Sequence, residues 1–280
     1  MTVRLANAEG RAVLVFGDRI ADVENASGGR FPADPMGVLA HWDDFAGWAS
    51  GIGAGAATGA LDETRLGPPT PRPAKVFAIG LNYKSHAAEA GLPLPKQPMV
   101  FTKFQNCVVG PRADVKLSSG YVDWEVELVV VIGRRCRDVA EANAFDVVAG
   151  YTIGQDISDR KLQFSDQPPQ FSMGKSIDTF GPIGPVIVSL DGVPNRDDLA
   201  LTCDVGGERM QTARSSDMVF SVSQLIAYLS KFCTLEPGDI IFTGTPDGVG
   251  SGQQPRRYLK AGEEIVSTIE SIGTMRNRCI

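Results

Sequence analysis

Residues 121–133 read YVDWEVELVVVIG, and this stretch decides how the rest of the chain is interpreted. Side chains alternate between the two faces of a strand, so Trp124 and every second residue after it form one apolar face. Glu125 and Glu127 share the other face, about 7 Å apart along the strand. Valines continue that second face, so it is half buried. Two carboxylates there repel each other and lose hydration, and they need a positive partner: Lys, Arg or a divalent cation.

A third carboxylate stands in a similar position further along the chain. Asp156 follows the apolar run VVAGYTIGQ at 147–155, so it is predicted at the end of a strand. Three carboxylates suit Mg²⁺, Mn²⁺ or Ca²⁺ and leave about three positions for water or substrate. Zinc fits less well, because His41 and His86 are the only histidines. The alternative is an edge strand whose glutamates face solvent without a metal.

The segment LNYKSHAAEAG at 81–91 contains a second candidate pair. A short helix is predicted over 84–90, closed by the following Gly and Pro. His86 and Glu89 are three residues apart and therefore neighbours on one helix face. A carboxylate beside an imidazole fixes its tautomer and raises its basicity, as a general base acting on water requires. The alternative is an ordinary surface pair, which is common on helices.

Two loops carry further candidate groups. Lys175 lies in MGKSIDTFGPIGP at 173–185, where it could stabilise an oxyanion or bind an acidic substrate. Thr245 lies in GTPDGVG at 244–250, whose backbone amides could hold an anion. The loop lacks the GK[ST] ending of a nucleotide-binding loop, which disfavours nucleotide hydrolysis. The alternatives are a solvated lysine and a simple turn.

Composition and charge limit the class of protein. The chain has 280 residues, of which 43% are hydrophobic, as expected of a globular enzyme. The 33 acidic and 27 basic residues give a net charge of −6, so we expect no nucleic-acid partner. Five scattered cysteines predict neither a zinc knuckle nor a disulfide framework. The N-terminus does not resemble a signal peptide and no stretch could span a bilayer, so we expect a soluble cytoplasmic protein without membrane contact.

The chain divides at a proline-rich segment, residues 68–73. A small α+β N-terminal domain is predicted over 1–70, including a helix over 35–48, and a larger domain over 71–280. Strands predominate in the larger region, and helices do not alternate with them regularly enough for a Rossmann fold or a TIM barrel. A mixed β-rich α+β fold, a sandwich or roll, is therefore expected. The expected strands are 75–80, 98–104, 121–133, 147–156, 184–190, 201–207, 239–244 and 263–279, and further helices are expected at 138–145, 158–164 and 221–231.

Several segments occur in an order that resembles one known family. They are GLNYKSHAAEAG, FTKF…VVGP, DWEVELVVVIGRRCRDV, GYTIGQDISDR, KSIDTFGPIGP and LEPGDIIFTGTPDGVG. This set resembles the fumarylacetoacetate hydrolase family over about residues 74–278, and within it the prokaryotic acylpyruvase or fumarylpyruvate hydrolase-like members. The resemblance implies a β-sandwich roll as the catalytic domain, with a small N-terminal α+β domain. It also implies a homodimer.

The resemblance assigns roles to individual positions. The metal ligands that it implies, for Mg²⁺ or Mn²⁺, are Glu125, Glu127 and Asp156. The implied catalytic residues are His86, Glu89 and Lys175. The implied substrate-binding residues are Tyr83, Lys103, Arg160, Gln163 and Thr245. Trp124 and Phe104 depart from the usual family residues and would reshape the substrate pocket.

The implied activity is hydrolysis of a carbon–carbon bond in a 2,4-dioxo acid or related 1,3-diketone, such as an acylpyruvate or fumarylpyruvate, in aromatic catabolism. Water activated by His86 and Glu89 would attack a carbonyl, and the departing carbanion would be held as a metal enolate. One alternative is an isomerase, decarboxylase, hydratase or dehydratase of the same fold, acting on a 2-oxo or 2-hydroxydienoic acid. A more distant alternative is a non-catalytic binding protein.

Overall fold

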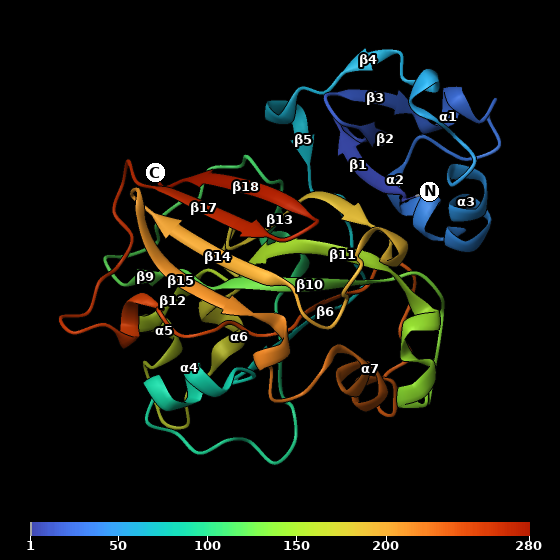
Figure 1. Ribbon diagram of the computed structural model, residues 1–280. Coiled ribbons are helices and arrows are strands. Elements are labelled where there is room, and N and C mark those ends of the chain that lie inside the picture. Colours follow the sequence, from blue (N-terminus) through green and yellow to red (C-terminus); the bar gives the residue numbers. More distant parts are fainter. Residues whose placement is uncertain (1) are drawn as a thin grey trace.

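The computed structural model in Figure 1 describes residues 2–280 and is dominated by one large mixed sheet. Ten of its strands are β1 Arg4–Ala8, β2 Arg11–Phe16, β3 Arg19–Asp22, β4 Gly59–Ala60, β6 Val76–Gly80, β7 Met99–Thr102, β10 Val126–Ile132, β11 Val148–Gln155, β13 Gly181–Val188 and β16 Ile240–Phe242. They form the order β4-β3-β2-β1-β13-β11-β10-β16-β6-β7. The strand β5 (Leu66–Gly67) pairs with β1, and β8 (Val108–Val109) pairs with β13. The strand β10 therefore lies inside the sheet, and β7 lies at its edge.

A second sheet of four strands covers the middle of the first. Its strands are β14 Ala200–Val205, β15 Glu208–Arg214, β17 Glu264–Ile269 and β18 Gly273–Arg278, in the order β15-β14-β17-β18. It packs on β10, β11 and β13, and Figure 1 shows it in yellow to red across the large sheet. Apolar side chains fill the space between the two sheets, as in a sandwich. The prediction of a mixed, β-rich α+β fold is confirmed.

The helices are short. They are α1 Val23–Ala26, α2 Pro35–Leu39, α3 Trp42–Ala49, α4 Lys84–Glu89, α5 Arg160–Gln163, α6 Phe171–Gly174 and α7 Val222–Ser230. In Figure 1, α4, α5 and α6 gather at the lower left, away from the N-terminal strands in blue. A capping box between Ser221 and Gln224 starts α7, as predicted for 221–231. None of the helices described over 2–280 combines the length and the apolar character that crossing a membrane requires.

Several predicted elements differ from those in the structure. The helix expected over 35–48 is two helices, because His41 between α2 and α3 has non-helical angles of φ −124° and ψ 38°. The helix expected over 138–145 is a 3₁₀ helix at Glu141–Val147. The strand expected over 263–279 is the hairpin β17–β18, which reverses near Ser271, a residue with a φ of +64°. Such a φ is typical of a turn.

The single strand expected over residues 121–133 is also interrupted. Residues 121–133 form two strands, β9 (Val122–Asp123) and β10, with Trp124 and Glu125 between them. The N–H of Trp124 donates to the Asp123 carboxylate at 2.9 Å, and that of Glu125 donates to Oε1 of Gln155 at 3.0 Å. These side-chain acceptors replace the strand pairing. The strand β9 pairs instead with β12 (Ser158–Asp159).

The prediction that one face of this strand is half exposed was wrong. All seven residues of β10 are buried. The cause is tertiary: β11 and β16 flank β10 in the sheet, and the four-stranded sheet covers it. The glutamates of this segment are therefore far less hydrated than the alternation pattern predicts, and their need for positive partners is greater.

The first strands are continuous with the rest of the molecule. Arg4 in β1 pairs with Val188 in β13, so the large sheet extends from the N-terminal region into the remainder of the chain. The division into domains 1–70 and 71–280 stays a prediction.

Candidate metal centre and active site

Three buried carboxylates meet where β10 begins and β11 ends. These antiparallel strands pair Val126 with Gln155, which places Glu125 beside Asp156. The N–H of Asp156 donates to the carbonyl of Glu125 at 2.9 Å and holds the two segments together. One ligand atom from each of Glu125, Glu127 and Asp156 lies within 4.8 Å of the others. The structure thus brings together the three predicted metal ligands, which the sequence separates by up to 31 positions.

Three cations surround two of these carboxylates. Lys175 Nζ lies 2.8 Å from Glu125 Oε2 and 2.7 Å from Asp156 Oδ2. Lys103 Nζ lies 2.6 Å from the other oxygen of Asp156. Arg160 Nη2 lies 2.6 Å from Glu125 Oε1. Burial alone would raise the pKa of Glu125, but Lys175 and Arg160 outweigh it and lower the pKa to about 2.

The surroundings of Glu127 differ from those of the other two carboxylates. It forms no ion pair within residues 2–280, and the backbone N–H of Gly244 donates to its Oε2 at 2.7 Å. Burial raises the pKa of Glu127 well above its ordinary value, and the neighbouring carboxylates Asp156 and Glu125 raise it further. One buried carboxylate therefore lacks the positive partner that the other two have.

This donor set fits a divalent cation. The three carboxylates supply only hard oxygen ligands, which Mg²⁺ and Mn²⁺ prefer. A dication among them would give Glu127 the positive neighbour that the side chains do not provide. Glu125, Glu127 and Asp156 are the residues that would hold it.

The predicted His–Glu pair forms on α4. His86 Nδ1 lies 3.0 Å from Glu89 Oε2, and both side chains are about 15% exposed. The N–H of Gly248 donates to the other oxygen of Glu89 at 2.9 Å. Glu89 is therefore held from two sides, which fixes the orientation of the imidazole.

A single glycine-rich loop, residues 244–252, connects these groups. Its backbone N–H groups donate to Glu127 from Gly244 and to Glu89 from Gly248. The N–H of Gly250 donates to Asp123 at 2.7 Å. The hydroxyl of Thr245 donates a hydrogen bond to the carbonyl oxygen of Val126 at 2.9 Å. The loop holds anions through its backbone amides, and these anions are carboxylates of the chain itself, which the sequence pattern alone did not reveal.

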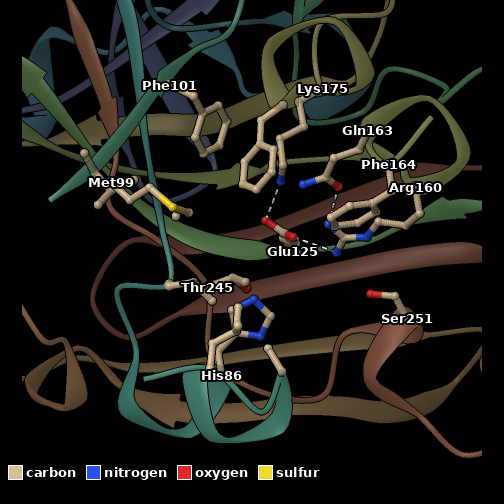
Figure 2. A pocket seen from close by; sticks show the side chains of 16 residues that line it. His86, Met99, Phe101, Glu125, Arg160, Gln163, Phe164, Lys175, Thr245 and Ser251 are labelled. Atoms are coloured by element: carbon tan, nitrogen blue, oxygen red, sulfur yellow. Dashed lines mark hydrogen bonds and ion pairs between the residues drawn. The ribbon is translucent and has the colours of Figure 1, made fainter. Parts of the chain in front are cut away.

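A cavity of about 160 Å³ lies beside the carboxylates. The predicted site residues that line it are His86, Glu125, Arg160, Gln163, Lys175 and Thr245. Figure 2 shows His86 and Thr245 below Glu125, and Lys175 above it. His86, which Glu89 orients, and Glu125 of the carboxylate cluster therefore face one space, in which a substrate could contact both.

Two predicted substrate-binding residues lie elsewhere. Tyr83 and Lys103 are buried and do not line this cavity. The hydroxyl of Tyr83 has no hydrogen-bond partner within the described residues, and burial raises its pKa above the usual range. Lys103 pairs with Asp156. Their predicted roles in substrate binding stay predictions.

Sequence reasoning missed Asp123. Arg160 Nε lies 2.8 Å from Asp123 Oδ2, and Ser251 N–H donates to the same oxygen at 3.0 Å. Asp123 thus links Arg160 to the glycine-rich loop. The signal was present, because Asp123 precedes Glu125 by two residues in the same alternating segment.

Comparison with known families gives one match over most of the chain. Residues 75–280 match the model described as fumarylacetoacetate (FAA) hydrolase C-terminal. A protein of Burkholderia multivorans that carries the provisional name of a hydrolase is 47% identical over 248 residues, which are 84% of this chain and 88% of that protein.

Solved structures share the whole fold. A protein provisionally named HpcE from Mycobacterium smegmatis is 46% identical with a TM-score of 0.93, covering 99% of both chains. Maleylpyruvate hydrolase from Sphingobium sp. SYK-6, in complex with manganese(II) and pyruvate, is 31% identical with a TM-score of 0.83, covering 99% of this chain and 98% of that one. A probable 2-hydroxyhepta-2,4-diene-1,7-dioate isomerase from Mycobacterium abscessus is 27% identical with a TM-score of 0.83, covering 100% and 98%.

Proposed function

The chain belongs to the fumarylacetoacetate hydrolase family, and from this premise we propose that it hydrolyses a carbon–carbon bond in a 2,4-dioxo acid or related 1,3-diketone. One observation carries the proposal: Glu125 of the buried carboxylate cluster and His86 of the His86–Glu89 pair line the same cavity. The first group suits substrate polarisation by a dication, and the second suits activation of water. The hydrolase relatives support the same reaction class.

The metal that we propose is Mg²⁺ or Mn²⁺ on Glu125, Glu127 and Asp156. Such an ion supplies Lewis-acid polarisation of substrate oxygens. The manganese in the related maleylpyruvate hydrolase supports this assignment. The chain's own contribution is to hold three carboxylates together against their repulsion, through Lys103, Lys175 and the N–H groups of the glycine-rich loop.

The remaining steps fall to side chains around the cavity. His86, oriented by Glu89 at 3.0 Å, takes a proton from water, and the hydroxide adds to C4 of the dioxo acid. Lys175 lies in the cavity wall, where its charge stabilises the oxyanion that forms. The bond between C3 and C4 breaks, its electron pair stays on C3, and C3 takes the proton from His86. The products are pyruvate, from a 2,4-dioxo acid, and a carboxylate.

The same cavity admits a second reaction class. An isomerase or decarboxylase acting on a 2-oxo or 2-hydroxydienoic acid would need the acidic residues but no activated water. A hydratase or dehydratase would add or remove water at a carbon–carbon double bond without cleaving the chain. The isomerase among the related structures favours this candidate. The His86–Glu89 pair favours hydrolysis, because a held imidazole beside the cavity is the group that water activation requires.

A substrate screen tests the proposal. The protein is supplied with Mg²⁺ or Mn²⁺ and assayed with 2,4-dioxo acids, with oxaloacetate and with hydroxydienoates, side by side. Loss of the enol absorbance of a dioxo acid, with equal amounts of pyruvate and carboxylate formed, is the expected result. Conversion of oxaloacetate or of a hydroxydienoate alone would replace hydrolysis with the second reaction class.

We also propose that the chain forms a homodimer. Exposed apolar side chains occur on the segments 92–104 and 162–173, and two of them line the cavity, which favours burial against a second copy. They are Leu92, Leu94, Phe104, Leu162, Phe164 and Met173. Light scattering at assay concentration measures the mass. A value of about 60 kDa, twice the 29.9 kDa of one chain, is expected, and a monomer mass would reject the dimer.

A further inference from the structure

The cavity has two chemically different ends. Glu125 and Lys175 form part of a polar end next to the proposed metal ligands. Met99 and Phe101, on alternate positions of the edge strand β7, line the other end, and Phe171 of α6 lines it with them. In Figure 2, Met99 and Phe101 lie together at the left of Glu125. A substrate that fills the cavity therefore meets ionised groups at one end and apolar groups at the other.

The apolar end is a connected wall of rings. Phe101 and Phe171 pack edge to face with centroids 5.5 Å apart, and Phe171 and Phe164 do so at 6.2 Å. We call Met99, Phe101 and Phe171 the apolar lobe; Phe164 lies beyond it, on the Arg160 side of Glu125 in Figure 2. Lys175 Nζ lies 5.2 Å from the centroid of Phe101, which marks the boundary between the lobe and the polar end.

No cation of the cavity wall is left for a charged group in this lobe, because each is already paired and Lys175 is assigned to the oxyanion of the proposed reaction. Within the described residues, Arg160 is paired with Asp123 and Glu125, and Lys175 with Glu125 and Asp156. The imidazole of the wall, His86, faces Glu89. A carboxylate placed in the apolar lobe would lose its hydration without gaining a partner, which is strongly unfavourable. A hydrocarbon group there would be stabilised by burial.

The size of the cavity limits the group. Its volume of about 160 Å³ is close to that of an engineered protein cavity, about 150 Å³, that holds a benzene molecule. The lobe is only part of this volume, so it suits a short chain or a single ring rather than a long acyl group.

We infer that the substrate carries a short, uncharged, apolar acyl group, which lies in the apolar lobe while the 2-oxo acid end faces the acidic residues. This inference rests on the proposed function and names its substrate class. The rival placement is a second carboxylate in the adjoining hollow, where Lys161 and Arg256 line the wall and form no ion pair within residues 2–280. The two placements of the acyl group predict opposite preferences between an apolar substrate and a dicarboxylate of equal chain length.

The first experiment compares two dioxo acids of equal chain length. The Mn²⁺-loaded protein is assayed with 2,4-dioxoheptanoate, which gives pyruvate and butanoate, and with 2,4-dioxoheptanedioate, which gives pyruvate and succinate. The apolar substrate should have a kcat/KM at least about tenfold higher, because the dicarboxylate must desolvate a charge. An equal or higher kcat/KM for the dicarboxylate would overturn the inference and leave the proposed hydrolysis in place.

A matched pair of variants locates the preference in the lobe. Met99→Lys adds a cation to the lobe and should reduce the preference for the apolar substrate by at least about tenfold. Val100→Lys adds the same charge on the next residue of β7, which is 38% exposed and does not line the cavity. It should leave the ratio unchanged. If both variants change the ratio of the two kcat/KM values equally, the substrate preference depends on the overall charge of the protein and not on the apolar lobe.

A binding measurement separates this inference from the proposed reaction. Calorimetry compares 2-oxoheptanoate with 2-oxoheptanedioate, which lack the second oxo group and cannot undergo the proposed cleavage. If the monoacid binds at least about tenfold more tightly than the diacid, the apolar lobe is supported. If, in addition, neither dioxo acid is cleaved, only the proposed hydrolysis is rejected. Binding of the diacid as tightly as the monoacid rejects the lobe, whatever the activity.

Discussion

Gly252 makes room for the carboxylate of Glu89: a Cβ added at position 252 would lie 2.3 Å from Cδ of Glu89. We expect Gly252→Ala to push this carboxylate away from its place beside His86. The imidazole would lose its fixed orientation, and hydrolysis should fall by about 10- to 100-fold. Affinity for Mn²⁺ should not change, because the acidic residues are untouched. Steady-state kinetics and calorimetry with Mn²⁺ measure the two effects.

Gly47→Ala is the control for this substitution. Gly47 lies in the exposed part of α3, and an added Cβ there meets nothing within 4 Å. This variant should retain full activity. Equal activity of Gly252→Ala and wild type would show that the contact between residue 252 and Glu89 does not position the base.

Substitutions of two proposed metal ligands should affect the stability of the metal-free protein differently. Asp156→Asn removes the negative charge that pairs with the buried ammonium groups of Lys103 and Lys175. The unfolding free energy of the metal-free protein should therefore fall by about 3 kcal/mol. Glu127→Gln breaks no ion pair and keeps an acceptor for Gly244, so the metal-free stability should be unchanged or higher. Both variants should bind Mn²⁺ at least about tenfold more weakly.

Urea unfolding in EDTA, together with Mn²⁺ calorimetry, tests this contrast. Unchanged Mn²⁺ affinity in either variant would argue against the carboxylate cluster as a metal site. A loss of metal-free stability in Glu127→Gln as large as in Asp156→Asn would mean that Glu127 already has a positive partner.

The raised pKa of Glu127 predicts how metal-free stability depends on pH. An unfolded glutamate titrates near pH 4.3, so above about this value the folded protein binds a proton that the unfolded chain has released. The unfolding free energy should therefore fall as the pH rises, by up to about 1.4 kcal/mol per pH unit, until Glu127 ionises in the folded state. Glu127→Gln lacks this contribution. Urea unfolding in EDTA at several pH values above 5 should give a steeper fall for the wild type, and parallel curves would contradict the shifted pKa.

The local parts of the site could be predicted from the sequence. The alternation of a strand places Glu125 and Glu127 on one side, and helical spacing places His86 beside Glu89. An apolar run that ends at Asp156 indicates a strand terminus. These relationships span a few residues, so backbone geometry alone determines them.

The rest depends on tertiary contacts. Lys103 and Lys175 reach Asp156 from 53 and 19 residues away in the sequence, and nothing near either lysine indicates the partner. The apolar lobe combines Phe101 of β7 with Phe171 of α6, which meet only after folding. The interruption of the strand at Trp124 depends on side-chain acceptors, which a propensity pattern does not include.

The role of His86 gives the most direct test of water activation. His86→Ala should bind Mn²⁺ with wild-type affinity, since the imidazole is not among the three clustered ligand groups. Hydrolysis of the preferred dioxo acid should fall by about 10²- to 10⁴-fold, the range that a positioned general base contributes. His41→Ala is the matched control, because His41 is the only other histidine and is exposed, and it should keep wild-type turnover. Near-normal turnover in His86→Ala would remove the imidazole from the reaction and favour the isomerase or decarboxylase class, in which no water has to be deprotonated.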